Sequence, residues 1–165
     1  MRRFAVLMLA LVVLWPALPA CAAFSEGNQT ARSVYVLPIT GEIDFGLAAF
    51  VRRGLAAAEQ NGAAVVLEIN TFGGLVAAAT EIRDAVVRAE VPVISYITDR
   101  AWSAGALIAL AAPQIAMAPG SSIGAAEPRP AEEKTISAVR AEFEATAQRT
   151  GRNPQIGRAS CRERV

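Results

Sequence analysis

Histidine is absent from this chain of 165 residues. Without it, neither a Ser-His-Asp triad nor a metal site with histidine ligands can form inside the chain. Lysine occurs once, as Lys134, and every other basic side chain is an arginine. Because arginine keeps its proton at any working pH, Lys134 is the only basic side chain here that could serve as a general base. The alternative interpretation is an ordinary solvated surface lysine.

Cysteine and charge are also scarce. The two cysteines, Cys21 and Cys161, do not make a disulfide framework. Charged residues make up 19% of the chain and the net charge is +1, which predicts no basic surface for nucleic acid. A hydrophobic content of 53% excludes an intrinsically disordered chain and suffices for the core of about one domain. We therefore expect no nucleic-acid partner, no metal and no other cofactor.

The N-terminus has the three parts of a secretory signal peptide. The first residues are basic, residues 4–14 form an apolar run that is short for a bilayer span, and small residues at 20–23 offer a cleavage zone. We predict a signal peptide over residues 1–23 and a polar lead-in over residues 24–33. A lipidated Cys21 and a buried N-terminal helix are the alternatives. Export would place the mature chain on the extracytoplasmic side of a membrane.

Hydrophobic runs and helical patterns alternate along the rest of the chain. The apolar runs predict strands, at 34–40, 63–69, 91–98 and 114–118. The helical patterns predict helices, at 45–60, 75–89, 104–111 and 135–149. Turns are expected at 41–44 and 119–124. This alternation predicts an α/β fold with a parallel sheet and right-handed crossover connections.

Ser103 stands at the junction between the third predicted strand and an apolar helix of small residues. Backbone N–H groups at a helix N-terminus have no partner within the helix, and the helix dipole is positive there. A serine in this place can cap the helix with its hydroxyl, which is the common role. It can also be a nucleophile whose oxyanion is stabilised by the neighbouring amides. Position alone leaves both roles open.

Two glycines, Gly73 and Gly74, end the second predicted strand. Glycine lets two backbones approach closely and allows positive φ, so the N–H groups of such a turn can point at an anion or an oxyanion. A plain turn is the alternative. The pair is not a dinucleotide-binding fingerprint, because the third glycine of that motif and a phosphate-loop lysine are both missing.

Four segments, in this order and spacing, resemble the Clp-protease/crotonase superfamily and, within it, the NfeD-type membrane serine proteases, the stomatin-associated peptidases. The segments are Gly41–Ile43, Asn70–Gly74, Ser103–Gly105 and Ala116–Ala125, and the interval from Lys134 to Gly151–Asn153 also matches. The resemblance covers residues 34–153. It implies a repeated strand-strand-helix spiral, here truncated, and an incomplete Clp-protease-like serine protease domain over residues 34–155.

The resemblance also implies a Ser–Lys dyad. Ser103 matches the nucleophile, Lys134 the general base, and Gly74 and Ala104 the residues whose amides form the oxyanion hole. The expected reaction is the cleavage of a polypeptide: Lys134 takes the proton of Ser103, an acyl-enzyme forms, and water hydrolyses it. A lysine must be neutral to accept a proton, and burial favours the neutral form, so we expect Lys134 to be buried.

The implied partners are a stomatin-like membrane protein as substrate and further copies of the chain in a homo-oligomer. Membrane association is expected through C-terminal segments that are missing from this sequence. Three other functions stay open: a signal-peptide-peptidase-like protease, a crotonase-like acyl-CoA enzyme, and a catalytically silent crotonase-fold scaffold that binds a stomatin-like partner. The predicted signal peptide argues against acyl-CoA chemistry, and Lys134 argues against the scaffold.

Phe72 differs from the family pattern, and Ser122 has two possible roles. Phe72 stands where the family usually has proline, which would alter the wall of the substrate cleft. Ser122 could help to position Lys134, or it could make an ordinary hydrogen bond within its turn.

The last ten residues, 156–165, change abruptly in character. They read like the translation of a sequencing-library adapter, and we expect the genuine sequence to stop near Gln155. A natural basic tail is the alternative.

Overall fold

The computed structural model describes residues 33–128 and 131–156. Its elements are β1 Val34–Ile43, α1 Phe45–Gln60, β2 Ala64–Gly74, α2 Val76–Arg88, β3 Val93–Trp102, α3 Ala104–Ala111, β4 Gln114–Met117, β5 Ser122–Gly124 and α4 Glu133–Arg149. Every predicted helix is present with nearly the predicted bounds. The predicted signal peptide over 1–23 and residues 157–165 lie outside the described residues, as does most of the lead-in.

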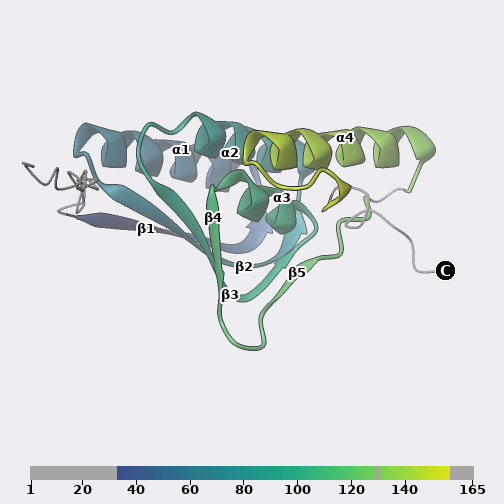
Figure 1. The fold of residues 1–165 in the computed structure, drawn as a ribbon, viewed down its shortest axis with the longest axis horizontal. Coiled ribbons are helices and arrows are strands. Elements are labelled where there is room, and N and C mark those ends of the chain that lie inside the picture. Colours follow the sequence, from purple (N-terminus) through teal and green to yellow (C-terminus); the bar gives the residue numbers. More distant parts are fainter. Residues whose placement is uncertain (1–32, 129–130, 157–165) are drawn as a thin grey trace, which may run out of the picture.

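All strand pairs of the sheet are parallel. The strand order is β1-β2-β3-β4, with β5 also beside β3. Figure 1 shows the long helices on one side of the sheet, and α3 contacts β2 and β3 on one side and α2 and α4 on the other. The prediction of an α/β fold with a parallel sheet is therefore confirmed. Pro38 lies in β1, an edge strand, where its missing N–H costs no central pairing.

Each long strand consists of two parts separated by an irregularity in register. The break lies between Thr40 and Glu42 in β1, and between Ile69 and Thr71 in β2. The first part of β3 pairs with β4, and its last three residues pair with β5. The short strand β5 is thus the second part of a fourth strand unit. Together with the helices, this gives the repeated strand-strand-helix arrangement that the resemblance implies.

Two expected turns are therefore partly strand. Residues 41–43 belong to β1 and residues 122–124 form β5. Both segments are rich in glycine and polar residues, which is the composition of a turn. Pairing with the neighbouring second strand parts overrides that local preference, because β-structure depends more on its partners than on intrinsic propensity.

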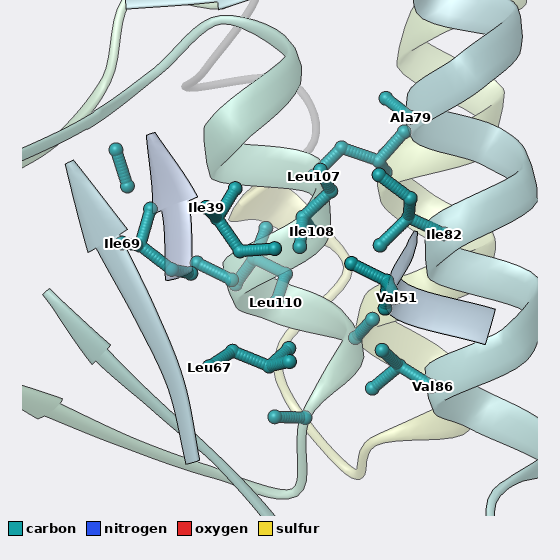
Figure 2. Packing of buried hydrophobic residues seen from close by; sticks show 14 of the residues in the cluster. Ile39, Val51, Leu67, Ile69, Ala79, Ile82, Val86, Leu107, Ile108 and Leu110 are labelled. Carbon is teal, nitrogen blue, oxygen red and sulfur yellow. The ribbon is translucent and has the colours of Figure 1, made fainter. Parts of the chain in front are cut away.

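The short helix α3 is the centre of the core, and all of its residues are buried. Figure 2 shows Leu107, Ile108 and Leu110 of this helix among apolar side chains of the sheet and of the outer helices. A helix that is apolar all round is stable only when it is covered on every side. Gly105 allows this helix to sit directly on the sheet, since a Cβ there would lie 2.5 Å from Cγ2 of Thr71.

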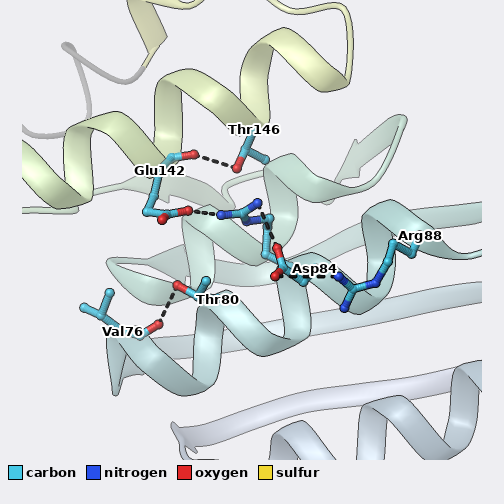
Figure 3. A network of polar contacts seen from close by, with 7 residues as sticks. Val76, Thr80, Asp84, Arg88, Glu142 and Thr146 are labelled. Carbon is cyan, nitrogen blue, oxygen red and sulfur yellow. Dashed lines mark hydrogen bonds and ion pairs between the residues drawn. The ribbon is translucent and has the colours of Figure 1, made fainter.

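Two polar contacts fasten α4 to the rest of the domain. The guanidinium of Arg152, just after α4, donates to the carbonyl oxygens of Leu110 at 2.9 Å and Pro113 at 3.1 Å. These carbonyls lie at the C-terminal end of α3, and burial lowers the pKa of Arg152 below its usual value. Arg83 on α2 forms ion pairs with Glu142 on α4 and, at 2.8 Å, with Asp84 (Figure 3).

None of the helices in the described ranges has both the length and the apolar character needed to cross a bilayer.

Candidate active site

Ser103 lies between β3 and α3 with a strained backbone. Its φ is 52° and its ψ is −120°, a conformation that costs a non-glycine residue about 1–3 kcal/mol. Its amide donates to the carbonyl oxygen of Gly124 on β5, at 2.8 Å. Ser103 occupies the N-cap position, but its hydroxyl makes no capping hydrogen bond. The backbone of Ser103 is thus strained, and its hydroxyl is not used as a cap.

Gly73 packs directly against this serine. A Cβ on Gly73 would lie 2.8 Å from the Cβ of Ser103 and 3.3 Å from the amide nitrogen of Ala104. The φ of Gly73 is 114°, which side chains rarely allow. Its own N–H donates to Oγ1 of Thr71 at 3.0 Å, and that hydroxyl donates to the carbonyl of Gly41 at 2.6 Å. Buried Thr71 therefore anchors the glycine turn, a role that the sequence alone did not indicate.

The two residues matched to the oxyanion hole lie on either side of this contact. Ala104 is the first residue of α3, where an N–H has no partner within the helix. Gly74 packs against the end of β1, so that a Cβ there would lie 2.5 Å from the amide nitrogen of Ile43. The structure thus brings Gly73, rather than Gly74, against Ser103. The N–H of Gly73 bonds to Thr71, and the role of Gly74 as an oxyanion donor stays a prediction.

A small apolar pocket opens beside Ser103, with a volume of about 20 Å³. This is room for roughly one water molecule. The walls come from α2, α3, α4 and the loop before α4; they are Val76, Ala79, Ala104, Leu107, Ala126, Pro128, Val139 and Phe143. The serine therefore faces a space that suits a small apolar group.

Lys134 lies in the first turn of α4 and is exposed. The expected burial of this side chain is wrong for the described chain. Among the described residues, no hydrogen bond or ion pair joins Lys134 to Ser103. The reason lies in the helix, whose buried face includes Val139 and Phe143. Lys134 precedes Val139 by five positions, which places it about 140° around the helix from that residue.

The hydrogen bond that the structure gives Ser122 is a different one from the two that the sequence suggests. Its Oγ accepts a hydrogen bond from Nε1 of Trp102 at 2.8 Å, which links β5 to β3 across the sheet. Trp102 in turn contacts Phe72 edge to face, with ring centroids 5.5 Å apart. The guanidinium of Arg100 lies 4.5 Å from the centre of the Phe72 ring. The sequence gives no signal for this cluster, because its members come from three strands.

No three His, Cys, Asp or Glu residues gather as metal ligands in the part of the chain that the structure describes.

The model of the NfeD1b N-terminal domain family matches residues 33–165. The chain belongs to that family. The matched range includes 156–165, the segment expected to be an artefact, whose origin stays a prediction. Within that segment the structure describes Ile156, which is partly buried against the core.

The chain is also similar to two curated proteins. The chain is 40% identical over 134 residues to the membrane protein NfeD1b of Bacillus subtilis, which covers 78% of this chain and 31% of that protein. It is 39% identical over 99 residues to the membrane-bound protease PH1510 of Pyrococcus horikoshii, which covers 58% of this chain and 22% of that protein. The chain thus spans less than a third of either relative.

The solved structures that it resembles have the same fold. A serine-to-alanine mutant of the 1510-N membrane-bound stomatin-specific protease superposes with a TM-score of 0.75 at 33% identity, over 79% of this chain and 70% of that one. The ClpP1 protein of Listeria monocytogenes superposes with a TM-score of 0.63 at 27% identity, over 78% of this chain and 80% of that one. The Clp-protease-like fold is therefore confirmed.

A lysine-to-alanine mutant of 1510-N was solved in complex with a substrate peptide, with a TM-score of 0.73 at 32% identity, over 80% of this chain and 67% of that one. The serine and the lysine mutated in that protein stand farther apart along its chain than Ser103 and Lys134 do here. If the pairs correspond, the intervening segment is shorter in this chain.

Proposed function

We propose that this chain carries the catalytic site of a membrane-associated serine endopeptidase, with Ser103 as nucleophile and Lys134 as general base. The observation that carries the proposal is the contact between Ser103 and Gly73. It joins a strained serine that does not cap its helix to a glycine turn and to the open N-terminus of α3. This is the arrangement that acyl transfer needs, since the nucleophile must lie beside N–H donors for the oxyanion.

In the proposed reaction, the Ser103 hydroxyl attacks the carbonyl carbon of a peptide bond. Lys134 takes the hydroxyl proton and then gives it to the departing amine, while the amides of Gly74 and Ala104 stabilise the oxyanion. Water then attacks the acyl-enzyme, and the carboxyl product leaves. Because Lys134 is exposed in the described chain, a substrate segment or a second copy of the chain must cover it during the reaction.

The substrate is proposed to be a polypeptide with a small apolar side chain at the cleaved bond. The support is the pocket beside Ser103, which is apolar and holds only about 20 Å³. A stomatin-like membrane protein is the proposed natural substrate, because the related 1510-N protease is named as stomatin-specific. Action on the extracytoplasmic side, self-association and attachment to a membrane through other segments belong to the same proposal. Both curated relatives are named as membrane proteins or membrane-bound.

One observation favours a second function, the catalytically silent scaffold. Lys134 is exposed, and no contact with Ser103 is found among the described residues. A scaffold would bind its stomatin-like partner without cutting it. The two proposals differ in what Ser103→Ala does: a protease loses cleavage, whereas a scaffold shows no cleavage to lose and keeps its binding.

The test is cleavage of a peptide library by the full-length protein and by its Ser103→Ala variant. Peptides with alanine or another small apolar residue before the cut should be cleaved by the parent protein and left intact by the variant. A parent protein that cleaves nothing, yet retains a stomatin-like protein, would favour the scaffold.

A further inference from the structure

Two exposed aromatic side chains, Phe72 and Trp102, and the half-buried Arg100 form a cluster that we call the aromatic clasp. Phe72 is 65% exposed and Trp102 is 36% exposed, whereas their strand neighbours Thr71 and Ala101 are buried. Side chains alternate between the two faces of a strand, so the clasp lies on the face of the sheet that points away from the core. The pocket beside Ser103 is lined from the core side, by α2, α3 and α4.

An aromatic ring pair and two cation–π contacts connect the three side chains of the clasp. The rings of Phe72 and Trp102 meet nearly at right angles, at 82°, with 5.5 Å between their centroids. The guanidinium of Arg100 lies 4.5 Å from the Phe72 ring centre and 5.5 Å from that of Trp102. Edge-to-face ring pairs and cation–π contacts both stabilise beyond the area that they bury.

Each ring of the clasp directly precedes a part of the candidate site. Phe72 is followed by Gly73 and Trp102 by Ser103, so their contact ties the two backbone segments that meet at the serine. Trp102 also donates to Oγ of Ser122 on β5. Two residues farther along β5, the carbonyl of Gly124 accepts the hydrogen bond from the Ser103 amide.

The backbone conformation of the glycine turn and of Ser103 must be stabilised by contacts with other residues. The glycines have no side chains that could fix their conformation, and Ser103 is held at a φ of 52° that it would leave if it were free. A strained residue persists only when its surroundings over-determine it. Thr71 holds the N–H of Gly73, and the carbonyl of Gly124 holds the amide of Ser103. The clasp adds a direct contact between the two segments, through the rings that precede Gly73 and Ser103.

We propose that the aromatic clasp is a positioning device, in which Phe72, Trp102 and Arg100 hold the Gly73–Gly74 turn and Ser103 in the geometry required for acyl transfer. This inference rests on the proposed function. The clasp residues do not touch the reacting atoms; they act through the backbone of the residues that follow them. A displacement of about 1 Å at a reacting group can cost on the order of 10²-fold in rate.

The test compares Phe72→Ala and Trp102→Ala with Tyr96→Ala in the full-length protein. Tyr96 is a matched control, because it lies on the same face of β3 as Trp102 and is 38% exposed. We expect kcat to fall about 10-fold to 10²-fold in both clasp variants, with KM within about twofold of the parent value. Thermal unfolding should stay cooperative in all three variants, which shows that the fold survives each change. Phe72→Tyr should restore most of kcat, because it keeps the ring.

The double variant adds a second criterion. If both residues act through one contact, Phe72→Ala combined with Trp102→Ala should lower kcat little more than either change alone. Unchanged kcat in the single variants would overturn the inference. So would a raised KM at constant kcat, since that result would make the clasp a docking surface for substrate.

Crystal structures of the two clasp variants provide a measurement that needs no activity. We expect Ser103 to leave its positive φ, or Gly73 to move away from it. An unmoved Ser103 in both variants would refute the positioning role even if the protein cleaves nothing. Persistent cleavage by Ser103→Ala, by contrast, would refute the proposed nucleophile and leave these structural results to decide the inference.

Discussion

Gly73 and Ser103 are in such close contact that a methyl group on the glycine would lie 2.8 Å from the Cβ of the serine. They are 30 positions apart in the sequence, at the ends of two neighbouring strands. Through this contact the glycine turn lies beside the Ser103 side chain, as does the N-terminus of α3. The backbone N–H groups that acyl transfer requires are therefore close to the serine. It also makes Gly73 the residue at which the geometry is easiest to disturb.

Gly73→Ala should lower peptide cleavage by about 10²-fold, because the new methyl group must displace Ser103 or the turn. The positive φ at position 73 adds about 1–2 kcal/mol of strain once the residue is alanine. Gly120→Ala is the control, since Gly120 also has a positive φ, 81°, but has nothing within 4 Å of its added Cβ. Steady-state kinetics with urea unfolding separates the two effects. Equal activity in both variants would mean that the contact does not matter for catalysis.

Ser103→Ala should reduce cleavage to the background rate and leave stability within about 1 kcal/mol of the parent value, because no capping hydrogen bond is lost. Peptide cleavage measures the first effect and circular dichroism with thermal unfolding the second. Ser137→Ala, at an exposed serine on α4, should change neither quantity. Cleavage that survives in Ser103→Ala would rule out this serine as the nucleophile.

The sequence predicts the helices of this fold well, because their apolar periodicity agrees with the face that they bury. The bounds of α1 and α3 are as predicted, and α2 and α4 differ by only one or two residues at a terminus. The second strand parts are less predictable. Residues 41–43 and 122–124 look like turns, and only a neighbouring strand that lies far away in the sequence makes them strand.

The candidate site likewise has one part that the sequence predicts and another that it does not. The junction at Ser103 follows from a local pattern of strand, serine and apolar helix. The contact with Gly73, the anchoring by Thr71 and the bond from Trp102 to Ser122 join different strands, and no local pattern encodes them. The predicted burial of Lys134 fails for a related reason, since it depends on the rotation of α4 about its axis and not on the spacing of residues along the chain.

Glu142→Gln should lower the free energy of unfolding by about 1–3 kcal/mol, because it removes the charge that pairs with Arg83, whose side chain is only 11% exposed. Arg88→Gln is the control. The distance from Arg88 to Asp84 is 3.8 Å and the Arg88 side chain is 70% exposed, so its loss should cost under about 1 kcal/mol (Figure 3). Urea unfolding measures both. Equal costs would show that the Arg83 pair does not secure α4.

Arg152→Ala should destabilise the domain by about 1.5–3 kcal/mol, because it leaves the carbonyls of Leu110 and Pro113 without their charged donor. Arg152→Lys should recover only part of this, since an ammonium group lacks the planar fork that reaches both oxygens. Arg149→Ala, at an exposed arginine in the last turn of α4, should be nearly neutral. Thermal unfolding distinguishes the three variants, and full recovery by lysine would show that only one of the two bonds matters.

Lys134→Arg should lower cleavage by about 10²-fold or more if this lysine takes the proton from Ser103. The substitution keeps the positive charge and most of the size but removes the ability to give up a proton at working pH. Glu133→Gln is the control, because Glu133 is its exposed neighbour in the first turn of α4. Steady-state rates from about pH 6 to pH 10 provide the second measurement. A reaction that needs a deprotonated base speeds up as the pH rises, so the pH profiles of the parent protein and of Lys134→Arg should differ.

The exposure of Lys134 makes this the sharpest test of the proposed function. Lys134 is exposed in the described chain, so the proposed dyad requires that substrate or another copy of the chain covers it during the reaction. If substrate provides this cover, kcat and kcat/KM should differ in their pH dependence, because kcat reports the complex and kcat/KM the free protein. Near-normal cleavage by Lys134→Arg with an unchanged pH profile would exclude the dyad. The absence of cleavage in parent and variant alike would leave the scaffold as the better proposal.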